Sequence, residues 1–94
     1  MMTFPIMIYK VAERSMEPAI KEGSYLVVNC WYRKVAAKEI VVLRANGMVM
    51  VKRIDRIEGS RIFVVGDNRE SSMDSRKLGW MDRKDIVGKL IVVI

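Results

Sequence analysis

Hydrophobic and polar residues alternate over short stretches of the chain, with the period of two that is typical of half-buried β-strands. The pattern predicts six strands, separated by turns, at residues 6–12, 24–31, 40–44, 48–57, 61–65 and 86–94. No stretch has the 3.6-residue period of a long amphipathic helix. Asn46-Gly47 predicts a tight hairpin, because both residues tolerate the positive φ angles of a primed turn. Glu58-Gly59-Ser60 predicts a second hairpin.

The length of 94 residues is enough for one domain with a modest core. Hydrophobic types make up 51% of the chain, which argues against disorder. We therefore expect a single all-β domain over residues 1–94, built as a coiled antiparallel sheet or a partly closed barrel. The longest predicted irregular segment, 66–84, is rich in Ser, Asp and Arg. Segments of that length in small domains are usually functional.

Seventeen Lys and Arg residues outnumber eleven Asp and Glu residues, so the formal net charge is +6. The basic residues are scattered, without the dense runs or interleaved aromatics of nucleic-acid platforms, and we do not expect a nucleic-acid partner. No stretch approaches the roughly 20 apolar residues that span a bilayer. No transmembrane segment is therefore expected, although peripheral membrane contact stays open. We expect a cytoplasmic location, or a membrane-associated one if the chain comes from an anchored parent.

Two residue types that often carry hydrolytic chemistry are scarce, because the sequence has no histidine and a single cysteine, Cys30. Ser-His-Asp triads and Cys-His pairs are therefore excluded. Neither an internal disulfide nor a cysteine-ligated structural zinc site can form, and we expect no cofactor and no metal. A hydrolase of this composition needs another base near neutral pH. The remaining candidate is a lysine that burial holds neutral.

Lys52 lies in the predicted strand 48–57, on the same side as Met50 and Ile54. Apolar surroundings would disfavour its ammonium form and lower its pKa. A fall from ~10.4 to ~8 requires about 3 kcal/mol of differential destabilisation. The alternative is a lysine whose stem packs on the sheet while its ammonium reaches water. The strand pattern alone favours this alternative.

Ser15 precedes the turn Met16-Glu17-Pro18. Its hydroxyl either caps this turn or is presented as a nucleophile beside backbone N–H groups that would bind an oxyanion. In the irregular segment we expect Asp74 and Arg76 to brace the loop with a charge-assisted hydrogen bond. The neighbouring hydroxyls that would orient a neutral lysine amine belong to Ser71, Ser72 and Ser75.

Three ordered motifs resemble those of the type I signal peptidase family of serine proteases. They are the nucleophile motif Ser15-Met16-Glu17-Pro18, the general-base motif Val51-Lys52-Arg53-Ile54 and a signature loop from Gly66-Asp67-Asn68 to Arg76. The resemblance covers the chain from about Val11 onwards, and the third motif is the most specific. It implies a catalytic core of the type shared by signal peptidases and LexA-type repressors, without a separate substrate domain. The chain is similar to small members that mature nickel superoxide dismutase precursors.

The resemblance implies a Ser/Lys dyad that removes an N-terminal extension or signal-like peptide from a protein precursor. Ser15 would attack the peptide carbonyl, Lys52 would take its proton and Ser72 would hold the amine in line. The backbone of Ser15 would contribute to the oxyanion hole. The residues that would support the site are Asp74, Arg76, Asp67 and Arg53.

Several features depart from the family pattern, and the one nearest the nucleophile is Glu13, which stands two positions before Ser15, where serine or glycine is common. A carboxylate in the oxyanion hole would oppose catalysis, so we expect Glu13 to face away unless the site is altered. Two alternative functions stay open. One is a non-catalytic, peptide-binding β-module of the same fold, and the other is a self-cleaving LexA-type repressor domain. No helix-turn-helix precedes Ser15, which argues against the repressor.

Overall fold

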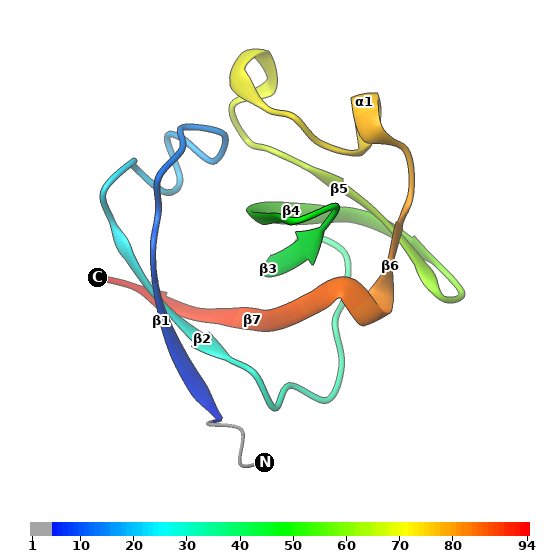
Figure 1. The fold of residues 1–94 in the computed structure, drawn as a ribbon, viewed down its shortest axis with the longest axis horizontal. Coiled ribbons are helices and arrows are strands. Elements are labelled where there is room, and N and C mark those ends of the chain that lie inside the picture. The colour runs from blue at the N-terminus through cyan, green and yellow to red at the C-terminus, as the bar shows by residue number, and fades with distance from the viewer. Residues whose placement is uncertain (1–4) are drawn as a thin grey trace.

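The computed structural model describes residues 5–94, which form one seven-stranded antiparallel sheet (Figure 1). The strands are β1 (Ile6–Lys10), β2 (Tyr25–Asn29), β3 (Ile40–Ala45), β4 (Met48–Glu58), β5 (Arg61–Val65), β6 (Met81–Asp82) and β7 (Ile86–Val93). Their order across the sheet is β1-β2-β7-β3-β4-β5-β6. Within the described residues the edge strands β1 and β6 do not pair with each other, so the sheet is open. The expected all-β fold is confirmed, in the form of one open antiparallel sheet.

All six predicted strands are present, with small differences at their ends. β1 stops at Lys10, short of the predicted residue 12. β6 is not predicted, since a two-residue strand is too short to show alternation. The segment after β5 contains three single helical turns, η1 (Arg69–Ser71), α1 (Ser75–Leu78) and η2 (Arg83–Asp85). Among residues 5–94 no helix has the length and apolar character needed to cross a bilayer.

Both predicted hairpins form. Asn46 and Gly47 have φ angles of 53° and 76°, and they connect β3 to β4 with Ala45 opposite Met48. Positive φ at both central positions is the requirement of a type I′ turn, which explains why this dipeptide stands here. Gly59, with a φ of 59°, lies in the turn that connects β4 to β5, where Glu58 pairs with Arg61.

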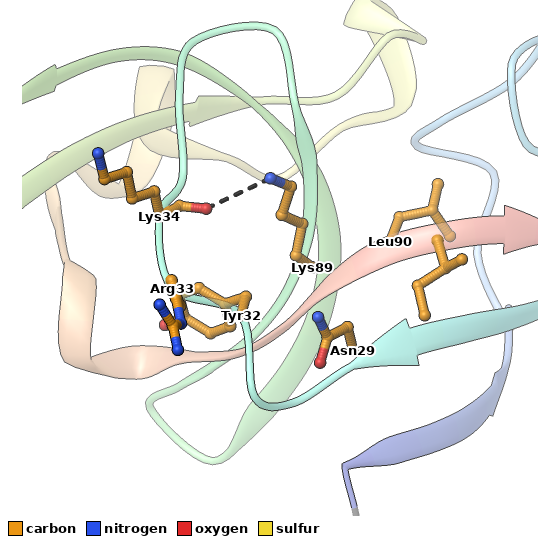
Figure 2. A pocket seen from close by; sticks show the side chains of 7 residues that line it. Asn29, Tyr32, Arg33, Lys34, Lys89 and Leu90 are labelled. Carbon is orange, nitrogen blue, oxygen red and sulfur yellow. Dashed lines mark hydrogen bonds between the residues drawn. The ribbon is translucent and has the colours of Figure 1, made fainter.

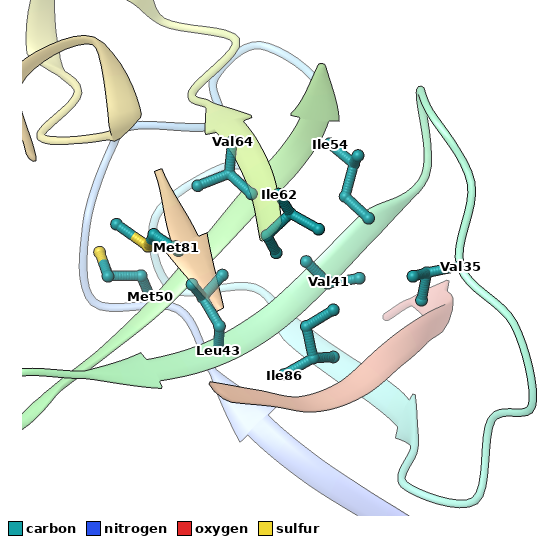
Figure 3. Close-up of a cluster of buried hydrophobic side chains, with 9 residues drawn as sticks. All are labelled: Val35, Val41, Leu43, Met50, Ile54, Ile62, Val64, Met81 and Ile86. Atoms are coloured by element: carbon teal, nitrogen blue, oxygen red, sulfur yellow. The ribbon is translucent and has the colours of Figure 1, made fainter. Parts of the chain in front are cut away.

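The core consists of two apolar clusters, to which neighbouring residues of the central strands contribute alternately. The first cluster contains Val35, Val41, Leu43, Met50, Ile54, Ile62, Val64, Met81 and Ile86 (Figure 3). The second contains Val11, Met16, Ile20, Leu26, Val28, Val42 and Val51. Because both clusters draw on β3 and β4, side chains on both faces of these strands are buried, which holds the centre of the sheet rigid.

The segment between β1 and β2 is fixed to the second cluster. Met16 and Ile20 are buried there, and the Ile20 amide donates to the Met16 carbonyl at 2.8 Å. The Val11 amide donates to the Ser24 carbonyl at 2.9 Å, which ties the start of the segment to its end. Ser15 is therefore carried by an anchored turn. In Figure 1 this turn and the loop after β5 lie on the same side of the sheet.

Candidate active site

Lys52 lies in β4 between Met50 and Ile54, opposite Val41 of β3. Its side chain is 1% exposed, so the alternative of an ammonium that reaches water is wrong. Burial lowers the pKa of Lys52, although the nearby carboxylates of Glu13 and Asp74 oppose this effect. β4 therefore provides a sheltered amine that loses its proton more readily than a solvated lysine does.

Ser15 is 1% exposed, and its hydroxyl donates a hydrogen bond to Glu13 Oε1 at 3.1 Å. Among the described residues this is the only side-chain hydrogen bond of Ser15, so the structure does not support a cap on the following turn. The Ser15 backbone N–H donates to none of the groups that the structure describes.

Glu13 connects the serine–lysine pair (Ser15 and Lys52). Its Oε1 atom, which accepts from Ser15 Oγ, also lies 3.6 Å from Lys52 Nζ. The expectation that Glu13 faces away is therefore wrong, because its carboxylate contacts the Ser15 hydroxyl and the buried Lys52 amine. Its own side chain is 39% exposed, so Glu13 reaches the pair from the solvent side.

Asp74 is the centre of a hydrogen-bond network in the loop after β5. Its Oδ2 atom accepts from Ser72 Oγ at 2.6 Å and from the Gly66 amide at 2.8 Å. The Arg76 guanidinium donates to both Asp74 oxygens at 3.0 Å. Burial alone would raise the pKa of Asp74, but these hydrogen bonds outweigh it and hold that pKa well below its usual range. The expected brace between Asp74 and Arg76 is present.

The three serines of this loop differ in their surroundings. Ser72 gives its proton to Asp74, so its oxygen keeps lone pairs that can accept another hydrogen bond. Ser75 Oγ instead accepts from the Val64 amide at 2.9 Å and fixes α1 to β5. The side chain of Ser71 lies outside the part of the chain that the structure describes. Of the three candidate hydroxyls, Ser72 is the one placed within the Asp74 network.

Asn68 fastens the loop to the segment that carries Ser15. Its amide donates to the Ser15 carbonyl at 2.8 Å, and its side-chain Nδ2 donates to the Arg14 carbonyl at 3.2 Å. Asn68 belongs to the signature loop but is not among the site residues expected from the sequence. The sequence shows an asparagine near the start of this loop, but it does not show which backbone groups the asparagine binds. The role of Asn68 becomes clear only from its contacts with the segment that carries Ser15.

Arg53 and Asp67 form a second brace. Arg53 Nε and Nη2 donate to the two Asp67 oxygens, both at 2.8 Å, and Nη1 donates to the Lys38 carbonyl at 2.7 Å. The hydrogen bonds from Arg53 lower the pKa of Asp67. Because Arg53 follows Lys52 in β4, its side chain points to the opposite face and holds the strand from there.

The structure thus places the predicted residues in three groups, and the members of each group are linked by hydrogen bonds or ion pairs. Ser15 and Lys52 meet through Glu13, Ser72 and Arg76 meet at Asp74, and Arg53 pairs with Asp67. Among residues 5–94 no three acidic or cysteine side chains gather in a way that would hold a metal ion.

A pocket of about 360 Å³ lies elsewhere, between the middle of β7 and the end of β2 with the segment that follows it (Figure 2). It is lined by Asn29, Tyr32, Arg33, Lys34, Lys89, Leu90 and Ile91. Lys89 Nζ donates to the Lys34 carbonyl at 3.3 Å and pairs with Glu39 at 2.6 Å, so its charge is already compensated. No member of the three groups above lines this pocket.

Comparison with known proteins adds a family to this geometry. A family model described as Peptidase S24-like matches residues 3–91. The chain is 42% identical over 33 residues, 35% of its length, to Signal peptidase I of Buchnera aphidicola subsp. Baizongia pistaciae (strain Bp). It is 53% identical over 34 residues, again 35% of its length, to Signal peptidase I P of Bacillus subtilis subsp. natto. These matches span only 11% and 18% of the two relatives.

Proposed function

Because the chain belongs to the Peptidase S24-like family, we propose that it is a serine endopeptidase with Ser15 as nucleophile and Lys52 as general base. The observation that carries this proposal is that Lys52 and Ser15 are both buried, with the Lys52 amine and the Ser15 hydroxyl next to the same Glu13 oxygen atom. Burying a charged ammonium lowers the stability of the fold because the charge loses its hydration. A buried neutral amine costs less and can accept the proton of the serine hydroxyl. The lowered pKa of Lys52 supports the neutral form.

In the proposed reaction, Ser15 Oγ bonds to the carbonyl carbon of the scissile peptide while Lys52 Nζ takes the hydroxyl proton. The carbonyl oxygen becomes an oxyanion that the free Ser15 N–H can bind. The Lys52 ammonium then gives its proton to the leaving amine as the C–N bond breaks. A water molecule, deprotonated by Lys52, attacks the resulting ester, and the proton returns to Ser15 Oγ when the acid product leaves.

Ser72 is proposed to orient the Lys52 amine. Since its own proton is committed to Asp74, the Ser72 oxygen is left as an acceptor for an amine N–H. Such a bond would direct the nitrogen lone pair toward the proton of Ser15. Asp74 and Arg76 then act through Ser72, while Asp67 and Arg53 hold the loop and β4 in place.

The proposed substrate is an N-terminal extension of a protein precursor, bound as an extended strand. Two features support this class. The relatives with matching segments are named signal peptidases, and β1 is an edge strand whose outer side pairs with no described strand. Maturation of a precursor of the nickel superoxide dismutase kind is the narrower form of the same proposal.

Labelling with a fluorophosphonate, which reacts with activated serines, tests this function. We expect the label on Ser15 at mildly alkaline pH, and we expect Ser15→Ala and Lys52→Met to abolish it. Matched controls are Ser60→Ala in the β4–β5 turn and Lys84→Met in η2, which remove an exposed serine and an exposed lysine and should label normally. Failure of the wild-type protein to label at any pH would contradict the peptidase proposal.

A non-catalytic, peptide-binding module is the second candidate, and one observation favours it. The Glu13 carboxylate contacts both members of the serine–lysine pair, and a negative charge there opposes formation of an oxyanion. A protein that binds extended peptides but never labels would fit this candidate.

A further inference from the structure

The position of Glu13 is inconsistent with a serine–lysine pair that is ready to react. Its Oε1 atom lies 3.1 Å from Ser15 Oγ and 3.6 Å from Lys52 Nζ. The Ser15 proton is therefore directed toward a carboxylate and away from the amine that should receive it. In addition, the carboxylate favours the charged form of Lys52, and it repels negative charge that develops beside Ser15. All three effects act against nucleophilic attack.

We propose that Glu13 is a positioning residue that holds Ser15 and Lys52 in a resting arrangement, and that an arriving peptide strand activates the site by displacing the Glu13 carboxylate into water. This inference rests on the proposed Ser/Lys function. Displacement is open to Glu13 because its side chain is partly exposed, whereas both of its partners are buried. A carboxylate that moves outward is rehydrated, and the peptide takes its place over Ser15.

Of the charged groups around Lys52, Glu13 is the one whose side chain can move away. Asp74 and Arg76 act on Lys52 from the loop after β5, but Asp74 is held by hydrogen bonds from Arg76 and from Ser72. Burial lowers the pKa of Lys52, and Glu13 raises it part of the way back. On the β1 side, burial and the charge of Glu13 raise the pKa of Tyr9, so its hydroxyl stays neutral near pH 7. Removing the Glu13 charge should therefore lower the pKa of Lys52 further, so that its ammonium loses its proton at a lower pH.

An NMR titration of the Lys52 side chain tests this without requiring activity, with the resonance assigned by its loss in Lys52→Met. We expect the titration midpoint to fall by about 1 pH unit in Glu13→Gln, since a contacting opposite charge shifts a pKa by that order. The matched control is Glu58→Gln, which removes the same charge at the exposed end of β4 and should leave the midpoint unchanged. A midpoint that stays or rises in Glu13→Gln would overturn the proposal.

Labelling kinetics give the second measurement. Glu13→Gln should react with the fluorophosphonate about tenfold faster than wild type on the acid side of the profile, which corresponds to the same 1-unit shift. Glu13→Ser, which also removes the carboxylate, should show the same increase in labelling rate. It serves as the test variant if Glu13→Gln does not fold. Slower labelling in both variants would assign Glu13 a required role and reject the resting-state role. Absence of label in wild type and both variants would instead reject the peptidase function, while the titration still decides what Glu13 does to Lys52.

Discussion

Gly66 and Ser15 approach each other so closely that a Cβ atom on Gly66 would lie 2.6 Å from the Ser15 carbonyl oxygen. The same Cβ would overlap the Ser72 hydroxyl. Glycine at the start of the signature loop is thus required by packing, because it lets the backbone of the loop pass between the nucleophile segment and Ser72. This close approach brings Ser15 and Ser72 into one site.

The first prediction concerns this approach. Gly66→Ala should lower the free energy of unfolding by about 1–3 kcal/mol, as expected for overpacking, and should also abolish labelling of Ser15. The control is Gly88→Ala, whose Cβ would lie 2.9 Å from the Asn29 carbonyl oxygen in β2. That variant should lose similar stability in urea unfolding but label normally while folded. Normal labelling in Gly66→Ala would contradict the packing argument.

The second prediction concerns Asp74, whose side chain is fully buried. Asp74→Asn should cost about 3 kcal/mol at pH 7, because it leaves the donors of Arg76 and Gly66 without their charged acceptor. The folded-state pKa of Asp74 is depressed, so its contribution is present above the unfolded pKa of ~3.9 and is lost as the pH falls toward the folded value. The stability difference between wild type and variant should therefore narrow below about pH 5.

Urea unfolding at pH 7 and pH 3 measures this difference. Asp82→Asn is the control, because Asp82 is the more exposed cap of η2 and accepts only the Lys84 amide in this role. It should cost about 1 kcal/mol or less. A gap between wild type and Asp74→Asn that stays constant with pH would show that the charge of Asp74 is not what the fold depends on.

Arg53 supplies the third prediction. Arg53→Lys should lower the free energy of unfolding by about 1 kcal/mol, because an ammonium cannot reproduce the paired bonds to Asp67 together with the bond to the Lys38 carbonyl. Added salt should reduce the difference, since the pair is partly exposed. Arg44→Lys, at an exposed position near the end of β3, should change stability by less than about 0.5 kcal/mol in the same urea assay. Equal losses of stability in Arg53→Lys and Arg44→Lys would contradict the claim that the two-bond contact between Arg53 and Asp67 stabilises the fold.

The sheet could be predicted from the sequence because its strands follow local rules. Alternation places Lys52 on the same side of β4 as Met50 and Ile54, and Asn46-Gly47 determines a hairpin by its own φ preferences. β6 could not be predicted, because two residues become a strand only by pairing with β5.

The contacts within the site were less accessible to sequence reasoning. The alternation pattern shows that Lys52 faces the core side, but its depth depends on segments that pack over it from distant parts of the chain. The orientation of Glu13 is set in the irregular stretch after β1, where no periodicity determines the direction of a side chain. Asn68 likewise gains its role only from its contact with the Ser15 carbonyl.

The last prediction concerns the cost of burying Lys52. Its folded-state pKa is lowered, so between that value and the unfolded ~10.4 the unfolded chain binds more protons, and stability rises with pH. Lys52→Met removes this penalty and should be more stable than wild type at pH 7 by roughly 1–3 kcal/mol, with the advantage shrinking as the pH approaches 10. Glu13, left without its cation, is exposed enough to be hydrated. Thermal unfolding between pH 7 and pH 10 measures the effect, and Lys84→Met should show no such pH dependence. A lower melting temperature for Lys52→Met at pH 7 would mean that Lys52 is stabilised as an ammonium by Glu13, and the general-base assignment would lose its physical basis.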